Sequence, residues 1–477
     1  MVGLLGRHFC RFIDDFRFIR NFGMSYAPKC DILKRKWRVV SHRAFSWRKR
    51  NVNFISKGAQ NETMQYQLSI TSNPDLRTLK NNLDAILEQH ASLLPQSRNA
   101  KVLLKPNFNS NMNALTGNTT DLRVIVGLIE ALQARGYKNI TIGEGTNSGF
   151  YRNQIDVASR LRVRQLAKRL GVTFLDLNYC QGRDITFVKN KKVKVARNCL
   201  EADLFINLPK LKMHHEVGVS VCLKNLMGCL VGQENKKKTH QSLARNIISL
   251  SQYVKPHLHI VDGLIAMEGN GPSDGLPVRM DTIIAGTDPY FIDMVCAEIA
   301  GMPYREVTYL KVAEELGLIT GGHREALRKL ELAGFKRNLL RPNVPLLVRA
   351  VCNPHLQKYF QMLRHAPGLY ALCNTKSAGD LFVKLGVRQE HFIEEEMRIK
   401  KILPDRDKCP PDCRKCNDYC PVGLDVPVVL SDKDESACIK CLYCYMVCPE
   451  RAIRLEGDFG FLKAQIDKYD PLIRRIA

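Results

Sequence analysis

The chain has 477 residues, 45% of them hydrophobic, and carries 72 Lys and Arg against 47 Asp and Glu, a formal net charge of +25. This length has room for two or three domains of ordinary globular composition. No apolar run reaches the about 18 residues that a membrane helix needs, and no signal peptide is recognisable, so we expect a soluble, cytoplasmic protein.

The first 63 residues differ in composition from the rest. They hold 14 Lys and Arg against 4 Asp and Glu, and both tryptophans. Apolar residues between Phe9 and Ile19 recur at helical spacing among arginines, a pattern compatible with a basic amphipathic helix on a membrane surface. We favour a basic, poorly ordered extension at 1–63, followed by a compact domain that begins at Met64.

From Met64 onward, short apolar strands alternate with amphipathic helices. We expect strands at 101–105, 139–142, 172–177, 203–208, 259–261 and 282–285. We expect helices at 79–94, from a Thr119–Thr120 cap to Gly136, at 155–170, at 241–254, and after Asp288-Pro289. This alternation predicts an α/β domain over 64–341, with a mostly parallel sheet covered by helices. A basic helical connector is expected at 342–400.

Polar residues collect directly after the predicted strands. They are Lys105 and Asn107, Glu144, Lys210, Lys212 and His214, Asp262, and Asp288. Ligands bind beyond the carboxyl ends of strands in open α/β sheets, so we expect a site at that edge. The competing interpretation is that loops at this edge are polar in any such protein.

The densest polar segment runs from Asn207 to Gly228. Neighbouring lysines lower one another's pKa, and a histidine beside them can move protons near neutral pH. We predict catalytic roles for Lys210, Lys212, His214 and Glu144. Binding of an anionic small molecule is assigned to Lys105, Asn107, Lys224, Asn225, Asp262, Glu268, Asn270 and Asp288. The alternative is a solvated basic loop followed by a buried amphipathic turn.

Two glycine-rich loops lie on the same side, at 143–149 and 268–275. Backbone N–H groups in such loops can hold a phosphate or carboxylate. Neither loop matches the dinucleotide fingerprint, and no Walker A sequence is present, so we favour tight turns over nucleotide binding.

Eight of the 17 cysteines form two runs near the C-terminus, each closed by Cys-Pro. The first run is Cys409, Cys413, Cys416 and Cys420, and the second is Cys438, Cys441, Cys444 and Cys448. The second has the bacterial ferredoxin spacing, whereas the first has one extra residue after Cys409. Tandem runs of this kind favour two [4Fe–4S] clusters over zinc.

In ferredoxins of this kind the fourth cysteine of each run binds the other cluster. We therefore expect cluster I on Cys409, Cys413, Cys416 and Cys448, and cluster II on Cys438, Cys441, Cys444 and Cys420. The ferredoxin domain is expected at 401–456, with a C-terminal tail at 457–477. The remaining cysteines are scattered, as buried thiols in a reducing cytosol would be.

Five motifs in order resemble domain-of-unknown-function family 362. They are Lys105-Pro-Asn107, Asn207-Leu-Pro-Lys210-Leu-Lys212 with His214, Leu223-Lys-Asn225-Leu-Met-Gly228, Asp262-Gly263 with Met267-Glu-Gly-Asn-Gly-Pro272, and Gly286-Thr-Asp288-Pro289 with Asp293. The resemblance covers roughly 64–456, and members are often fused to a two-cluster bacterial-type ferredoxin. It implies an iron–sulfur redox protein and no named reaction. The segment from His214 to Lys224 is also similar to a region of lactate racemase-like enzymes, although it lacks their double glycine.

Three functions fit these features. We favour an iron–sulfur oxidoreductase in which the clusters exchange electrons with a substrate or cofactor at the strand-end site. The alternative is an electron carrier whose basic surface docks a redox partner protein of ferredoxin or flavodoxin type. A nucleic-acid-associated protein with structural clusters is disfavoured, because no nucleic-acid-binding motif accompanies the charge.

Overall fold

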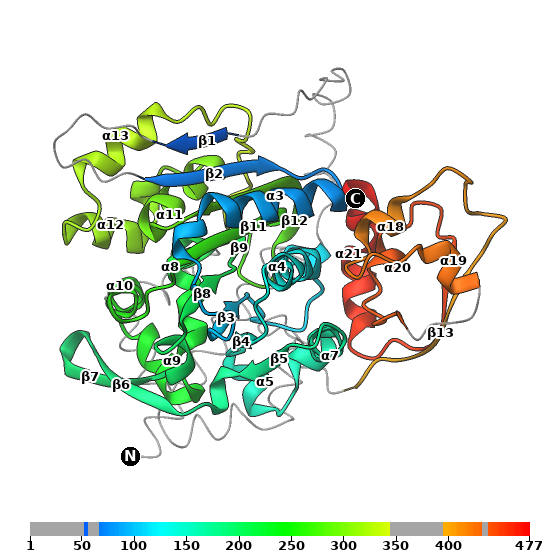
Figure 1. Ribbon diagram of the computed structural model, residues 1–477, viewed down its shortest axis with the longest axis horizontal. Helices are drawn as coiled ribbons and strands as arrows, with labels where there is room; N and C mark the ends of the chain where they lie inside the picture. The colour runs from blue at the N-terminus through cyan, green and yellow to red at the C-terminus, as the bar shows by residue number, and fades with distance from the viewer. Residues whose placement is uncertain (1–51, 56–65, 344–394, 432–436) are drawn as a thin grey trace, which may run out of the picture. The chain divides into compact units, whose positions relative to one another are not determined.

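Figure 1 shows the computed structural model of the chain, which describes residues 52–55, 66–343, 395–431 and 437–477. These residues all fall within one compact unit, Arg50–Leu363 with Phe392–Ala477. Of the basic extension predicted at 1–63, only β1 (Val52–Ile55) is described, and it pairs antiparallel with β2 (Gln67–Ser72). The amphipathic helix considered near the N-terminus and nearly all of the predicted connector lie outside the described residues.

The α/β domain is built on a ten-stranded sheet with the order β1-β2-β12-β11-β8-β3-β4-β5, to which β9 and β10 attach beside β11. The further strands are β3 (Val102–Lys105), β4 (Ile140–Glu144), β5 (Thr173–Asp176), β8 (Leu204–Asn207), β9 (Lys210–His214), β10 (Gly218–Ser220), β11 (Leu258–Glu268) and β12 (Leu276–Gly286). The strands from β11 to β5 pair in parallel, while β12 runs antiparallel to β11 and to β2. The predicted mostly parallel sheet is therefore confirmed.

Helices cover both faces of this sheet because its strands are apolar on both sides. In β8, Phe205 packs into one core cluster and its neighbours Leu204 and Ile206 pack into the other. The first cluster takes in α8 (Cys222–Asn225), α10 (Leu243–Tyr253), α11 (Pro289–Ile299), α12 (Thr308–Glu315) and α13 (Gly321–Lys329). The second takes in α3 (Leu76–Gln89), α4 (Leu122–Ala134), α6 (Val157–Arg160) and α7 (Val163–Arg169).

Several elements differ from the sequence expectations. The segment after Asn207 forms two paired strands, β9 and β10, where a loop was expected. The single helix expected at 155–170 is broken into α6 and α7 because Arg162 adopts a left-handed conformation, φ 64°. The cap of α4 is Asp121, whose carboxylate accepts a bond from Arg123 N, and not the Thr119–Thr120 pair.

Several further elements had no counterpart in the sequence analysis, and four of them lie between β4 and α10. They are α5 (Ser148–Arg152), α9 (Gly232–His240), and the antiparallel hairpin of β6 (Gly182–Phe187) and β7 (Lys191–Ala196).

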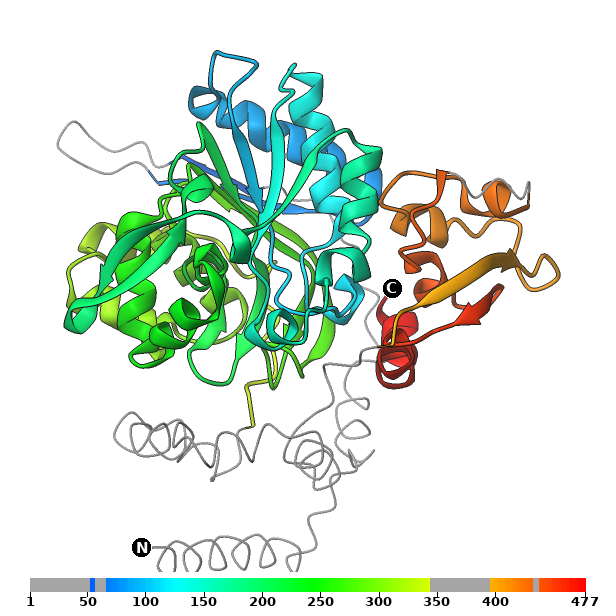
Figure 2. The ribbon, with the colours of Figure 1, turned by 90° about the horizontal axis from the view of Figure 1, so that it is seen from below.

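The C-terminal part of the chain forms the ferredoxin-like segment, which is drawn in orange to red in Figures 1 and 2. Its elements are β13 (Arg398–Pro404), α18 (Lys415–Tyr419), α19 (Val426–Ser431), α20 (Tyr443–Val447), β14 (Ile453–Asp458) and α21 (Leu462–Ile476). Strands β13 and β14, which lie at the two ends of the segment predicted at 401–456, pair antiparallel with each other. The tail expected at 457–477 contains α21. Within the described residues, none of the helices has the length and apolar composition to span a membrane.

Candidate functional site

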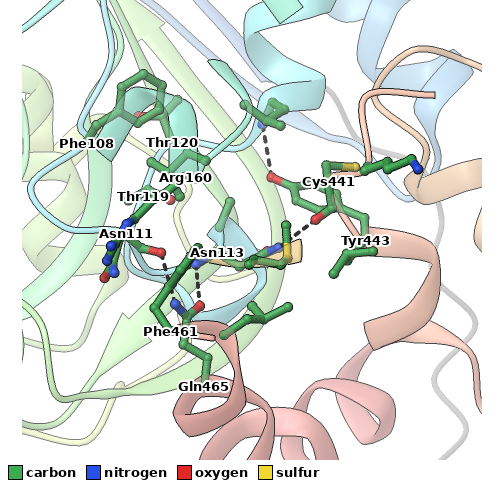
Figure 3. Close-up of a pocket in the computed structure, with 17 residues that line it drawn as sticks. Phe108, Asn111, Asn113, Thr119, Thr120, Arg160, Cys441, Tyr443, Phe461 and Gln465 are labelled. Atoms are coloured by element: carbon green, nitrogen blue, oxygen red, sulfur yellow. Dashed lines mark hydrogen bonds between the residues drawn. The ribbon is translucent and has the colours of Figure 1, made fainter. Parts of the chain in front are cut away.

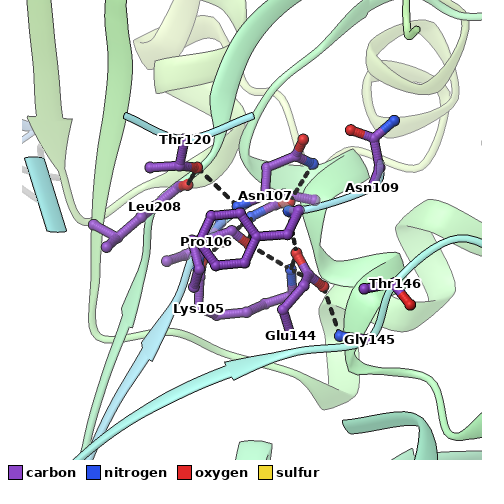
Figure 4. A network of polar contacts seen from close by, with 12 residues as sticks. Lys105, Pro106, Asn107, Asn109, Thr120, Glu144, Gly145, Thr146 and Leu208 are labelled. Carbon is purple, nitrogen blue, oxygen red and sulfur yellow. Dashed lines mark hydrogen bonds and ion pairs between the residues drawn. The ribbon is translucent and has the colours of Figure 1, made fainter. Parts of the chain in front are cut away.

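A buried ion pair joins the ends of two neighbouring strands. Lys105 ends β3, Glu144 ends β4, and the Lys105 Nζ atom lies 3.0 Å from both carboxylate oxygens of Glu144 (Figure 4). Glu144 also accepts bonds from the backbone N–H groups of Phe108 and Gly145. Both side chains are almost fully buried. The hydrogen bonds that the Glu144 carboxylate accepts thus all come from groups inside the fold. This carboxylate therefore holds the Lys105 side chain in place.

A second buried ion pair lies between adjacent strands. Lys210 on β9 is opposite Asp262 on β11, and its Nζ atom is 2.9 Å from Asp262 Oδ2. The same oxygen accepts a bond of 2.7 Å from Asp121 N, while Asp262 Oδ1 accepts one from Leu264 N. We call Lys105, Glu144, Lys210 and Asp262 the ion-pair cluster. One of its two ion pairs joins β3 to β4, and the other joins β9 to β11.

Two glycines allow the chain to close around the first ion pair. A Cβ atom on Gly228 would lie 1.9 Å from Glu144 Oε1 and 2.7 Å from Lys105 Nζ. A Cβ atom on Gly145 would lie 2.4 Å from the Gly228 carbonyl oxygen. Both distances are far below van der Waals contact, so only glycine fits at either position.

A different set of cationic groups lies next to the ion-pair cluster, and among the described residues none of these groups forms an ion pair with a carboxylate. Lys212, His214 and Lys224 form this lysine–histidine cluster. Strand alternation places Lys210, Lys212 and His214 on one side of β9, while Leu211 and Met213 pack into the core. Lys212 Nζ donates to the amide oxygens of Asn107 and Asn109, at 2.7 and 2.8 Å.

The electrostatics of these three residues differ from those of ordinary lysines and histidines. Burial, followed by the charges of Lys210 and Lys224, holds the pKa of Lys212 well below its usual value. Burial and the charge of Lys224 likewise keep the pKa of His214 well below 6.5, so His214 is neutral at pH 7. Its Nδ1 atom accepts from Glu216 N, which leaves the proton on Nε2.

Lys224 is the half-buried member of the lysine–histidine cluster. Burial lowers its pKa to about 8, with the charge of Glu216 acting in the opposite direction and that of Lys105 in the same direction. Within the part of the chain that the structure describes, the Lys224 ammonium group makes no hydrogen bond or ion pair. An anion would therefore find a free cation here.

The remaining predicted ligands divide between this site and other places. Asn107 and Asn225 belong to it, because Asn107 Nδ2 donates to Asn225 Oδ1 at 2.8 Å. Glu268 instead accepts from Leu340 N, and Asn270 is exposed. Asp288 caps α11 and contacts His323. Since β12 runs antiparallel to β11, its end at Gly286 pairs with His259 near the start of β11, so Asp288 lies away from the Asp262 end.

Two contributors to the site were missed by the sequence analysis. Asp121 directly precedes the first apolar residue of α4, a recognisable cap position, yet its backbone contact with Asp262 has no signal in the sequence. Lys236 is buried and donates to the carbonyl oxygens of Gly145 and Thr146 at 2.9 and 2.8 Å. Burial lowers the pKa of Lys236 to about 8.

The eight clustered cysteines surround two cavities in the ferredoxin-like segment. One cavity is lined by Cys409, Cys413, Cys416 and Cys448. The other is lined by Cys420, Cys438, Cys441 and Cys444. In the described segments no three His, Cys, Asp or Glu side chains converge as the ligands of one ion do. Four thiolates around a volume are the arrangement that a [4Fe–4S] cluster requires, because each cysteine binds a different iron.

The second of these cysteine groups adjoins the α/β domain. Asn113 Nδ2 donates to the Cys441 carbonyl oxygen at 3.3 Å, and Gln465 of α21 bonds both Asn111 and Asn113 (Figure 3). The guanidinium carbon of Arg123 lies 4.2 Å from the centre of the Tyr419 ring, and Tyr419 directly precedes Cys420. The Asp121 carboxylate accepts two hydrogen bonds from the Arg123 guanidinium group and holds it there. Polar side chains of the strand-end loops and of α4 thus contribute to the interface, beside apolar residues such as Tyr443 and Met446, which share a core cluster with α3 and α4.

Comparisons with known proteins agree with these two parts. The family described as Domain of unknown function (DUF362) matches residues 102–298, and the 4Fe-4S binding domain matches residues 432–454. A curated relative, the thylakoid-associated protein sll1697 of Synechocystis sp., is 28% identical over 231 residues, which are 46% of this chain and 68% of that protein.

A solved structure, the lactate racemase apoprotein of Thermoanaerobacterium thermosaccharolyticum, aligns with a TM-score of 0.34 and 11% identity. The alignment covers 48% of this chain and 56% of the racemase chain, so the match spans little more than half of that structure.

The second family match contains the complete run from Cys438 to Cys448 and supports at least one iron–sulfur cluster. The resemblance inferred from the sequence motifs is confirmed: residues 102–298 match the DUF362 family, and residues 432–454 match the 4Fe-4S binding domain.

Proposed function

We propose that this protein is an iron–sulfur oxidoreductase that binds two [4Fe–4S] clusters and exchanges electrons with an anionic substrate or cofactor at the α/β site. Cluster I would be held by Cys409, Cys413, Cys416 and Cys448, and cluster II by Cys420, Cys438, Cys441 and Cys444. The support for two clusters is that each expected ligand set lines its own cavity. Bound clusters would supply one-electron transfer.

The observation that carries the proposal is a continuous set of contacts between the two domains. Lys210 pairs with Asp262, and Asp262 accepts from the backbone of Asp121. The Asp121 carboxylate in turn holds Arg123 against Tyr419 in the ferredoxin-like segment. The ferredoxin-like segment and the polar site are therefore connected through buried groups.

Within the site, the two groups of residues have different tasks. The ion-pair cluster holds the ends of β3, β4, β9 and β11 in place, because each of its charges is already compensated. Lys224 would bind the anionic group of the substrate, with Lys212 and Asn107 beside it. Neutral His214 would donate a hydrogen bond from its Nε2–H group to the substrate and so help to orient it.

The test is anaerobic reduction of the reconstituted protein, followed by titration with candidate anionic acceptors. We expect one acceptor class to reoxidise the protein, and Lys224→Ala to slow reoxidation without changing the cluster absorption. The matched control is Lys237→Ala, which removes an exposed lysine that pairs with Glu234 on α9. Equal rates in the wild type and in Lys224→Ala, or no acceptor at all, would contradict the proposal.

An electron carrier remains the second candidate, because Lys105 and Lys210 are already neutralised and the chain carries a net charge of +25. A ferredoxin- or flavodoxin-type partner would then dock on the basic surface. Docking between exposed charges weakens steeply with salt, whereas reoxidation by a small anion bound at Lys224 depends on salt only weakly. A cytoplasmic location is part of both proposals.

A further inference from the structure

The short helix α8, which carries Lys224, has no cap of its own. A helix of four residues is too short to be stable alone, and its first N–H groups need acceptors from outside the helix. A serine, threonine, aspartate or asparagine directly before a helix usually supplies such an acceptor. In α8 this position is Val221, whose side chain has no acceptor atom. The acceptors therefore have to come from another part of the chain.

Asp293, on the adjacent helix α11, supplies these acceptors. Its Oδ1 atom accepts a bond of 2.8 Å from Cys222 N, and its Oδ2 atom accepts one of 3.2 Å from Leu223 N. The hydroxyl group of Tyr309 on α12 donates to the same Oδ2 atom at 3.0 Å. Asp293 and Tyr309 are fully buried. Hydrogen bonds from two other helices thus compensate for the burial of this carboxylate, and two of them fix the start of α8.

Asparagine side chains hold α8 from the other side. Asn207 Nδ2 donates to the Cys222 carbonyl oxygen at 3.1 Å, and Asn225 Nδ2 donates to Asn207 Oδ1 at 2.8 Å. Lys224 lies between these fixed residues, and its ammonium group has no hydrogen-bond partner of its own in the described chain. The position of that ammonium group is therefore set by the backbone of α8 and by the residues that hold this backbone.

We propose that Asp293 is a positioning residue of the anion site, which caps α8 and so holds the Lys224 ammonium group where it binds the anion. Asp293 is enclosed in the core between α8, α11 and α12, so it acts through α8 and does not touch the anion. The sequence analysis assigned no role to Asp293, although this residue belongs to one of the five motifs. The inference rests on the proposed function, because it takes Lys224 as the residue that binds the anion.

The test is the sulfate affinity of the holoprotein, measured by isothermal titration calorimetry at pH 7.5. At this pH most of the Asp293 carboxylate is ionised, because burial raises its pKa to about 7, and most of Lys224 is charged, because its pKa is about 8. We expect Asp293→Ala to weaken sulfate binding by as large a factor as Lys224→Met does. Asp293→Asn keeps an oxygen that can accept from Leu223 N and Tyr309, so its affinity should lie between those of the wild type and Asp293→Ala.

The matched control is Asp288→Ala, with the free energy of unfolding of every variant measured by urea denaturation. Asp288 caps α11, the helix that carries Asp293, and its side chain accepts from Tyr290 N and Phe291 N. Its removal should destabilise the protein and leave the sulfate affinity unchanged. A residue that only stabilises the fold would behave in the same way, whereas a positioning residue also changes the affinity of the folded protein.

The outcomes separate this inference from the proposed function. An affinity that falls in Lys224→Met and is unchanged in both Asp293 variants overturns the role of Asp293 and leaves the anion site standing. An equal loss of affinity in Asp288→Ala and Asp293→Ala overturns it as well, because any destabilisation of α11 would then suffice. Equal affinities in the wild type and Lys224→Met overturn the anion site and this inference together. If Asp293→Ala does not fold, Asp293→Asn decides: a lowered affinity supports the role of Asp293, and an unchanged one contradicts it.

Discussion

The ion-pair cluster and the lysine–histidine cluster are neighbours built from the same residue types, yet they are different kinds of site. Lys105 and Lys210 each face a buried carboxylate at 3.0 and 2.9 Å. Lys212 donates to two amide oxygens, and Lys224 has no hydrogen-bond acceptor within bonding distance among the described residues. A lysine whose charge is compensated inside the fold organises structure, whereas one without a counter-ion can bind an anion. The distinction lies in the partners and not in the lysines.

The largest effect is expected from removing a carboxylate of the ion-pair cluster. Asp262→Ala leaves the fully buried Lys210 without its counter-ion, which costs about 3–5 kcal/mol of the free energy of unfolding. Urea denaturation followed by circular dichroism measures it. The double variant Asp262→Leu with Lys210→Met replaces both charges by apolar groups and should recover most of the loss. A loss below about 1 kcal/mol in the single variant would falsify the structural role.

The next effect concerns the space around Glu144. Gly228→Ala places a methyl group 1.9 Å from Glu144 Oε1, so the ion pair or the backbone has to move. We expect a destabilisation of about 1–3 kcal/mol, typical of overpacking. The matched control is Gly334→Ala, where nothing lies within 4 Å of the new Cβ atom, and its effect should stay within about 0.5 kcal/mol. Equal stabilities of the two variants contradict the close fit.

Some parts of the site could be predicted from the sequence, and others could not. The two cysteine runs could be recognised, because their spacing is local: each run lies within a dozen residues. The partners of the lysines could not, since Glu144 is 39 residues from Lys105 and Asp262 is 52 residues from Lys210. Only the sheet pairing brings them together, and that pairing is a property of the whole fold.

The strand containing Lys210 had a signal that the sequence analysis did not use. Lys210, Leu211, Lys212, Met213 and His214 alternate between polar and apolar, the period of a strand with one buried face. The direction of β12 had no such signal. The sequence analysis treated every polar residue after a strand as lying at one edge, which fails for Asp288 because β12 is antiparallel to β11.

A substitution of Asp288 therefore tests whether this residue acts in the stability of the fold or in anion binding. Its side chain accepts from Tyr290 N and Phe291 N at the start of α11 and contacts His323 Nε2 at 3.1 Å. Asp288→Ala should lower the free energy of unfolding by about 1 kcal/mol, the usual effect of losing a helix cap. The rate of reoxidation by the anionic acceptor should not change. A slower rate at unchanged stability would instead return Asp288 to the binding site.

A further effect is expected at Lys224, where the charge itself can be titrated. Its pKa in the folded protein is lowered to about 8, so charging it disfavours the folded state. Its contribution to stability therefore rises with pH between about 8 and the unfolded value near 10.4. Lys224→Met should flatten the stability profile across this window, and an unaltered profile would show that Lys224 is an ordinary solvated lysine.

Anion binding at Lys224 should show the opposite pH dependence. Sulfate keeps its charge across this range, so its binding follows the charge of Lys224, being strongest below pH 8 and lost above it. At a free concentration equal to Kd, a bound ligand stabilises by RT ln 2, about 0.4 kcal/mol. Because sulfate also stabilises proteins non-specifically, the measured quantity is the difference between wild type and Lys224→Met, with Lys237→Met as the control. If the difference in sulfate stabilisation between wild type and Lys224→Met is the same at pH 7 and pH 9.5, a cation other than Lys224 binds the anion. Lys212 would then be the lysine of this cluster that binds anions.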